Sequence, residues 1–127
     1  MIHDEFCTYE VAKLAKEKGF DEATYYTYEE ESKRLNRMRY CVKRNSRIGS
    51  IIKLIAAPTQ SLLHRWMREE KGVIIELKYS DSTEDWRPFW SWCIYNNWGF
   101  TLEIGDNFAT YELALEDALK YALENLI

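Results

Sequence analysis

Two histidines are the first candidates for acid–base chemistry in this chain. His3 lies near the amino terminus, and His64 lies in an amphipathic segment beside Arg65 and Arg68. Cationic neighbours disfavour a protonated imidazole, and neither histidine has a nucleophile or a second base at a recognisable spacing. We therefore expect His64 to be a surface histidine rather than a general base.

The cysteines and carboxylates give no stronger indication of catalysis or metal binding. The three cysteines are widely spaced and odd in number: Cys7, Cys41 and Cys93. This spacing favours neither a disulfide framework nor a paired-cysteine zinc site. Adjacent acids such as Glu69 and Glu70 point in different directions and make poor catalytic pairs, and the sequence has no glycine-rich phosphate loop or paired-histidine metal motif. We expect no enzymatic activity, no metal and no cofactor.

The strongest signal for binding is a run of basic residues in the middle of the chain. From Lys33 to Arg68 the sequence contains no acid, and this stretch holds ten of the 17 lysines and arginines. Such a concentration of positive charge attracts phosphate backbones, and an aromatic ring within it could stack on a base. The candidate nucleic-acid-binding residues are Arg37, Arg39, Tyr40, Lys43, Arg44 and Arg47.

An alternative interpretation of the basic run is internal pairing. The rest of the chain holds seven bases and 21 acids, so the net charge of -4 conceals a basic middle between acidic ends. The acids at residues 29–31 and in the last helix could pair with these cations inside the fold, which would leave a surface of mixed sign. No recognised nucleic-acid-binding motif decides between the two interpretations.

The aromatic segment at residues 86–95 is a second binding signal, and its meaning depends on hairpin register. A two-residue turn at Asn96 and Asn97 places Trp90 and Trp92 on the face opposite Cys93, as an exposed patch or subunit contact. A three-residue loop at residues 97–99, with a left-handed glycine, instead places the tryptophans in the core. It pairs Ile94 with Leu102 and Trp92 with Ile104. The candidate partner-interface residues are Ile74, Trp90 and Trp92.

The free energy of burial favours the three-residue loop, which places the tryptophans in the core. Burying an aromatic side chain is worth about 1.5–3 kcal/mol. If the tryptophans are not covered within one chain, a second copy related by a two-fold axis is the simplest partner, so a homodimer is an expected assembly.

Three helices and a three-stranded antiparallel meander are expected to position these residues. The helices begin after Thr8, Thr59 and Thr110, each a good N-cap, and the first two end near Gly19 and Gly72. A short strand is expected at residues 23–28, and the meander strands at 73–80, 86–95 and 98–104. Residues 81–85 are expected to form a polar turn.

The basic stretch gives no clear periodic pattern. We interpret residues 30–39 as a loop or one short helix, because the apolar stripe there is sparse. Residues 40–42 and 48–55 are apolar enough to be extended, with Asn45 and Ser46 as a turn between them and Gly49 as a bulge.

The predicted fold is α+β in one domain over residues 1–127, in the order α, irregular basic segment, α, β, β, β, α. The helices that follow Thr59 and Thr110 are expected on one face of the meander. At 127 residues, with 46% hydrophobic residues, the chain is long enough to bury a core without disulfides. No apolar run reaches the length of a membrane span and no signal sequence is recognisable, so we expect a cytoplasmic protein with no membrane partner.

Short segments in the three helices resemble a known family. They are residues 58–63 with 65–69, residues 9–14 with 16–22, and residues 110–112 with 122–124. Together these are similar to a family of small uncharacterised proteins from gut-dwelling anaerobic bacteria and their phages or integrated elements. The likeness covers about a third of the chain and leaves residues 25–57 uncovered. It implies a phage-related or mobile-element setting, and it implies no activity, cofactor or catalytic residue.

From these observations we expect a small non-enzymatic interaction protein. The alternative is an accessory nucleic-acid-binding protein that uses the basic segment at residues 33–68. A hydrolase or transferase ranks last, because no small-molecule substrate site is identifiable.

Overall fold

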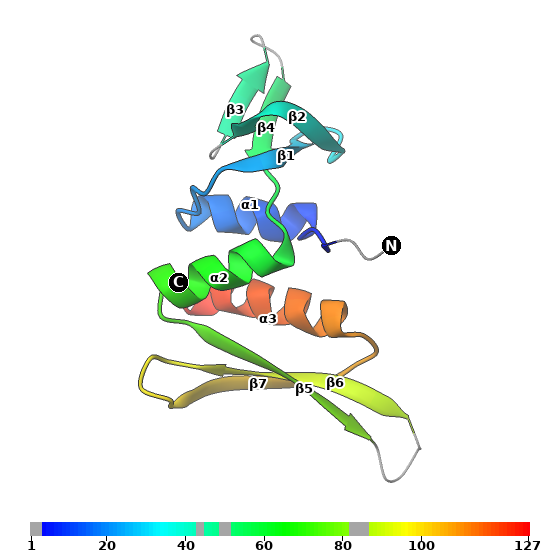
Figure 1. Cartoon of the computed structure of the whole chain (residues 1–127), viewed down its shortest axis with the longest axis vertical. Coiled ribbons are helices and arrows are strands. Elements are labelled where there is room, and N and C mark those ends of the chain that lie inside the picture. Colours follow the sequence, from blue (N-terminus) through cyan, green and yellow to red (C-terminus); the bar gives the residue numbers. More distant parts are fainter. Residues whose placement is uncertain (1–3, 43–44, 49–51, 82–86) are drawn as a thin grey trace. The chain divides into compact units, whose positions relative to one another are not determined.

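The computed structural model describes residues 4–42, 45–48, 52–81 and 87–127, and between residues 40 and 52 it describes the backbone alone. The chain forms two compact units, residues 1–63 and 64–127, which are described separately. The elements are α1 (Tyr9–Glu17), β1 (Thr24–Glu29), β2 (Leu35–Val42), β3 (Asn45–Ile48), β4 (Ile52–Ala56), α2 (Gln60–Glu70), β5 (Ile74–Asp81), β6 (Pro88–Tyr95), β7 (Thr101–Phe108) and α3 (Tyr111–Asn125) (Figure 1). The mixed α+β class is therefore confirmed.

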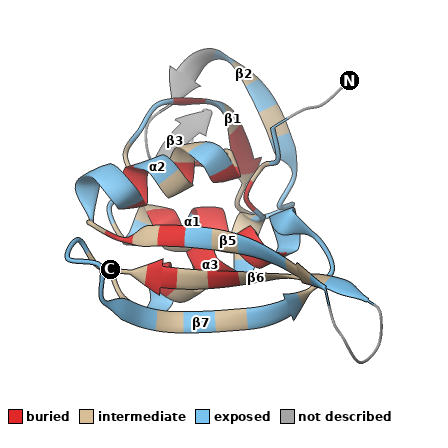
Figure 2. Cartoon of the chain, turned by 60° about the horizontal axis from the view of Figure 1, so that its bottom comes forward, coloured by how far each residue is buried: buried red, intermediate tan, exposed pale blue. Residues whose placement is uncertain are grey.

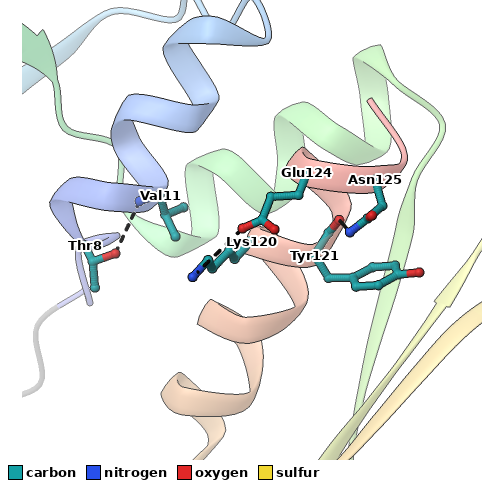
Figure 3. A network of polar contacts seen from close by, with 6 residues as sticks. All are labelled: Thr8, Val11, Lys120, Tyr121, Glu124 and Asn125. Carbon is teal, nitrogen blue, oxygen red and sulfur yellow. Dashed lines mark hydrogen bonds and ion pairs between the residues drawn. The ribbon is translucent and has the colours of Figure 1, made fainter.

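All three predicted helix starts are confirmed by their caps. The hydroxyls of Thr8, Thr59 and Thr110 each accept a hydrogen bond from the backbone amide three residues further on, at 3.3, 3.1 and 3.1 Å. Figure 3 shows the first of these caps, in which the amide of Val11 donates to Thr8. Each cap satisfies an amide that has no partner within its own helix, so short local sequence signals are enough to fix where the helices begin.

The N-terminal unit is a four-stranded antiparallel sheet with the strand order β2-β1-β4-β3. Helix α1 packs beside β4, and Ala12 lies in a buried cluster with Tyr28, Ile55 and Ala57. The hydroxyl of Tyr28 donates to the carbonyl of Cys7 and so ties the segment before α1 to the sheet. The strand predicted at residues 23–28 is confirmed as β1.

The prediction of an irregular basic segment is wrong. Residues 30–39, interpreted as a loop or short helix, contain the start of β2, and the predicted turn at Asn45 and Ser46 lies in β3. Sequence periodicity missed β2 because it is an edge strand on which Leu35, Arg37 and Arg39 are all exposed, so no apolar alternation marks it. The bulge predicted at Gly49 and most of the polar turn predicted at residues 81–85 lie outside the described residues.

The C-terminal unit contains the predicted meander, with the strand order β5-β6-β7 (Figure 1). Helix α3 contacts all three strands and covers one face of the sheet. Its buried stripe is Ala114, Leu115, Ala118, Leu119, Ala122 and Leu123. Near the end of α3, the side-chain amide of Asn125 donates to the carbonyl of Tyr121 at 3.0 Å, and Lys120 Nζ lies 3.9 Å from Glu124 Oε1 (Figure 3).

The hairpin between β6 and β7 has the predicted three-residue loop followed by an unpredicted bulge. Gly99 has a left-handed φ of 81°, and Tyr95 pairs with Thr101. The register then shifts by one residue, so that Ile94 pairs with Glu103 rather than with Leu102. Neither predicted pairing is therefore the observed one.

Close packing beside Trp92 explains this shift. Trp92 pairs with Gly105 rather than with the predicted Ile104, and a Cβ atom at Gly105 would lie 2.3 Å from the indole ring. The bulge therefore brings the residue without a side chain next to the ring, and Trp92 is only 3% exposed. Burial of Trp92, expected for the three-residue loop, is confirmed.

Across the described ranges of the chain, no helix is long and apolar enough to cross a membrane.

Candidate interaction surface

The meander has one face covered by α3 and one face that α3 leaves open. Side chains alternate along a strand, so the contacts of α3 assign the two faces. The indole Nε1 of Trp92 donates to Asp117 of α3 at 3.0 Å, and the hydroxyl of Tyr121 of α3 donates to Glu103 at 3.0 Å. The residues that alternate with Trp92 and Glu103 point the other way. We call these residues the open face: Ile74, Glu76, Lys78, Phe89, Ser91, Cys93, Tyr95 and Ile104.

Large apolar side chains are exposed along β7 and the loop that leads into it. Trp98 is 83% exposed, Phe100 67%, Leu102 42% and Ile104 62%. We call these four residues the apolar surface. Figure 2 shows exposed residues along much of β7, whereas the neighbouring strand β6 carries buried ones. Single exposed apolar residues are ordinary, but four within seven positions of one hairpin are a typical sign of a binding surface.

The loop that carries Trp98 is held rigidly by hydrogen bonds. The side-chain oxygen of Asn96 accepts hydrogen bonds from the amides of Trp98 and Phe100, both at 3.0 Å. The amide of Gly99 donates to the carbonyl of Asn96, also at 3.0 Å. These bonds fix the backbone at Trp98, so binding through this loop has little backbone entropy to lose.

The other side of this loop lies against the end of α2. Gly72, which ends that helix, has a left-handed φ of 65°, and a Cβ atom there would lie 2.5 Å from the side chain of Asn97. The predicted helix stop at Gly72 thus has a second role, because the missing side chain lets the loop pack closely against the helix terminus.

The charges of the C-terminal unit are predominantly acidic. Residues 64–127 hold six lysines and arginines against 12 aspartates and glutamates. On the open face itself, Glu76 and Lys78 carry opposite charges. The pKa of the Tyr95 hydroxyl on the same face is raised, mainly by its hydrogen bond to the Cys93 thiol. An acidic unit repels phosphate backbones.

The predicted partner-interface residues do not lie together. Ile74 is half-buried on the open face, whereas Trp92 is buried beneath α3. Trp90 is half-buried and makes edge-to-face contacts with Tyr79 and Tyr111, with ring centroids 5.1 and 5.3 Å apart.

Sequence reasoning did not select the apolar surface. The alternation of Trp98, Phe100, Leu102 and Ile104 was its only signal, and that pattern is equally typical of a strand facing the core.

The predicted nucleic-acid-binding residues are only partly described. Arg37 and Arg39 are exposed on β2, and within the described ranges no carboxylate lies at ion-pair distance from either guanidinium. Tyr40 and Arg47 lie in strands β2 and β3, and Lys43 and Arg44 fall outside the described residues.

Other cations of the basic stretch have partners. Lys53 pairs with Glu30 at 3.2 Å, Arg65 pairs with Glu69 at 3.0 Å, and Lys33 lies over the ring of Tyr9 at 5.4 Å. Some cations of the basic stretch are therefore paired within the fold, whereas the arginines of β2 are open to solvent, and nucleic-acid binding by this stretch stays a prediction.

His64 is not the simple surface histidine that the sequence predicted. It is half-buried, and its Nε2 lies 3.2 Å from the carbonyl oxygen of Ile75, so it joins α2 to β5. A carbonyl can only accept, so Nε2 carries the proton. Burial, and then the nearby Arg68, lower the pKa of His64. His3 lies outside the described residues.

A cavity of about 360 Å³ lies in the N-terminal unit and has aromatic walls. Its lining residues are Asp4, Phe6, Thr24, Tyr25, Tyr26, Ala57, Thr59 and Leu62. Two of its hydroxyls already have backbone partners, because Thr24 donates to the carbonyl of Tyr26 and Thr59 caps α2. The other polar groups of the lining are the carboxylate of Asp4 and the hydroxyls of Tyr25 and Tyr26.

In the part of the chain that the structure describes, no three histidine, cysteine, aspartate or glutamate residues are grouped so that they could hold a metal ion. No protein-family model, no curated protein and no solved structure matches this chain.

Proposed function

We propose that the protein is a small non-enzymatic interaction protein that binds a protein partner through the apolar surface. The observation that carries this proposal is the exposure of Trp98, at 83%, on a loop fixed by hydrogen bonds. Tryptophan is among the residues most enriched at the energetic centres of protein interfaces. Phe100 and Ile104 extend the surface on either side of the bulge.

The area available is large enough for such a role. An aromatic side chain offers about 150–250 Å², so the exposed parts of Trp98 and Phe100 amount to about 300 Å². At about 25 cal/mol per Å², burying these two side chains contributes about 7 kcal/mol. This gain must offset the entropy cost of association, which the rigid loop reduces.

The cellular setting belongs to the same proposal. The resemblance of the three helices to small proteins of gut anaerobes and their phages supports a phage-related or mobile-element role, exercised in the cytoplasm. An interaction protein without catalytic residues is consistent with such a setting, and neither cofactor nor substrate enters the proposal.

Chemical cross-linking followed by affinity purification tests the proposal. A tagged chain should cross-link to partner protein, a second copy of the chain included, and Trp98→Ser with Ile104→Ser should abolish that recovery. The matched control is Tyr25→Ser with Leu35→Ser, which removes apolar residues of the other unit that are 52% and 37% exposed. Recovery that is equal in all three proteins would contradict the proposal.

A second candidate function is accessory nucleic-acid binding by β2. Arg37 and Arg39 favour it, because both are exposed on an edge strand and arginine side chains at such positions can contact phosphates. Fluorescence anisotropy with single- and double-stranded oligonucleotides, measured against salt, tests it. Each lost phosphate contact lowers the salt slope by about 0.7–0.9, so Arg37→Ser with Arg39→Ser should lower it by about 1.4–1.8.

The control for this assay is Arg65→Ser, which removes an exposed arginine of the other unit that is already paired with Glu69. Binding should persist in that variant. An unmodified protein that binds no oligonucleotide at low salt would remove this second candidate.

A further inference from the structure

We infer that the partner of the apolar surface is a second copy of this chain, with the two open faces packed against each other around a two-fold axis. This inference rests on the proposed function and names its partner. The product would be a two-layer β-sandwich in which α3 of each copy covers the outer side of its own sheet. Four observations lead to it.

The first observation is the area that the open face and the loop leave uncovered. Phe100 alternates with Thr101, which pairs with Tyr95, so Phe100 points to the side of the sheet that α3 covers and is not counted. Trp98 in the loop and Ile104 on the open face together expose about 300 Å², when their exposed fractions are applied to typical side-chain areas. A stable interface needs roughly 800 Å² from each partner. The remainder would come from the exposed Glu76 and Lys78 and from half-buried residues of the open face, namely Ile74, Phe89, Cys93 and Tyr95.

The second observation is that the open face is self-complementary in charge. It carries Glu76 and Lys78 on β5, one acid and one base. In a two-fold interface, residue i of one copy meets residue j of the other and the reverse contact follows by symmetry. Two copies can therefore bring each Lys78 towards the partner's acid, whereas a strongly acidic or basic partner would leave one of these charges unpaired.

The third observation concerns the edge of the sheet. Strand β7 is an edge strand without lysine or proline, the residues that commonly protect such edges. However, the amide of Ile104 donates to the side chain of Glu103 at 3.0 Å, and Leu102 is a bulge residue. Both features disfavour pairing of two β7 strands edge to edge. The other edge strand, β5, carries Lys78, a residue type that commonly protects such edges. The features of the two edges therefore favour contact through the face.

The fourth observation is the pattern on the central strand of the open face. Cys93 and Tyr95 are only half-buried, and Cys93 pairs with Glu76 on one side and Ile104 on the other. Two layers of antiparallel sheet typically pack about 10 Å apart with interdigitated side chains. A second copy would thus cover the partly exposed residues of β6 together with Ile104.

Sedimentation velocity across a dilution series tests this inference. The unmodified chain should sediment as a species of twice 15.2 kDa at high concentration and shift towards 15.2 kDa on dilution. Ile104→Asp should sediment at 15.2 kDa throughout, because a buried unpaired carboxylate is incompatible with the contact. The matched control, Leu35→Asp in the other unit, should behave like the unmodified chain.

Two results would overturn the inference. One is a mass of 15.2 kDa for the unmodified chain at every concentration, and the other is an Ile104→Asp variant that is as dimeric as the unmodified chain. Circular dichroism melts confirm that each variant folds, and Ile104→Ser provides a second, milder variant. A monomeric chain that still cross-links to another protein through Trp98 and Ile104 would overturn the second copy as partner and leave the proposed function standing.

Discussion

Gly105 of β7 lies directly against the indole ring of Trp92, so Gly105→Ala tests the packing that fixes the sheet register. A Cβ atom at this position would lie 2.3 Å from Trp92 Cε2 and 2.4 Å from Trp92 Nε1. Gly105 does not have a positive φ, unlike Gly99. Alanine therefore causes no backbone strain there, and any loss of stability reports the contact with the ring.

The expected loss follows from how tightly the ring is held. Trp92 is 3% exposed, its Nε1 donates to Asp117 at 3.0 Å, and its ring centroid is 5.6 Å from that of Tyr121. Overpacking of a well-packed core costs about 1–3 kcal/mol, and a lost hydrogen bond to a charged group costs about 1.5–3 kcal/mol more. Because the ring is expected to tilt rather than leave its site, we expect Gly105→Ala to lower the free energy of unfolding by about 2–4 kcal/mol.

Urea unfolding followed by tryptophan fluorescence is the appropriate assay. All five tryptophans lie between residues 64 and 127, so their emission reports on the C-terminal unit. In a Trp92→Leu background, which removes the ring, Gly105→Ala should cost less than about 1 kcal/mol, which gives a coupling energy of at least about 1 kcal/mol. Equal costs in both backgrounds, or a loss below about 0.5 kcal/mol in the unmodified protein, would refute this account of the register.

Three further changes test other contacts of the same unit. Trp66→Ala should lower the free energy of unfolding by about 3–5 kcal/mol in urea melts, because Trp66 is 5% exposed and a cavity would replace it; a loss below about 1 kcal/mol would contradict its burial. The folded-state pKa of His64 lies below its ordinary value of 6.5, so the stability it contributes is complete above pH 6.5 and is lost as pH falls through the folded-state pKa. The free energies of unfolding at pH 7 and at about pH 5 should therefore differ more in the unmodified protein than in His64→Gln. An equal difference in the two proteins would refute the lowered pKa of His64. Asn96→Ala removes the acceptor of two amide hydrogen bonds and should cost about 1–3 kcal/mol while weakening partner recovery; unchanged recovery would show that loop rigidity is unimportant.

The helices were predictable from the sequence because their signals are local. A threonine hydroxyl reaches an amide three residues further along the same chain, and a glycine such as Gly72 ends a helix through its own backbone conformation. Neither signal depends on what packs against the helix. The meander was predictable for a related reason, since alternation along β5 and β6 repeats every two residues.

The N-terminal sheet could not be predicted in the same way. Strand β2 is an edge strand whose Arg37 and Arg39 face solvent, so its sequence shows charge where a strand pattern requires apolar residues. Its place is set by pairing with β1, in which Tyr26 pairs with Arg37. That pairing is a tertiary contact that no local pattern reports.

The candidate site was only partly predictable. Sequence reasoning recognised that aromatic residues of the hairpin need burial or a partner, and it identified the loop with Gly99. It could not place the bulge that brings Gly105 to Trp92, because the need for a glycine arises only when the ring is already packed. For the same reason it selected Trp92 as an interface candidate, whereas the exposed tryptophan of the hairpin is Trp98.

The chemical reactivity of Cys93 tests most directly whether the open face is a contact surface. Its thiol is half-buried on that face and pairs with Ile104, whereas Cys7 is fully buried and serves as an internal reference. Alkylation of the peptide that contains Cys93, followed by mass spectrometry, should slow as protein concentration rises, in proportion to the fraction of dimer, and should remain fast in Ile104→Asp. A rate of Cys93 alkylation that is the same at all concentrations and in both proteins would contradict the assignment of the open face as the site of self-association.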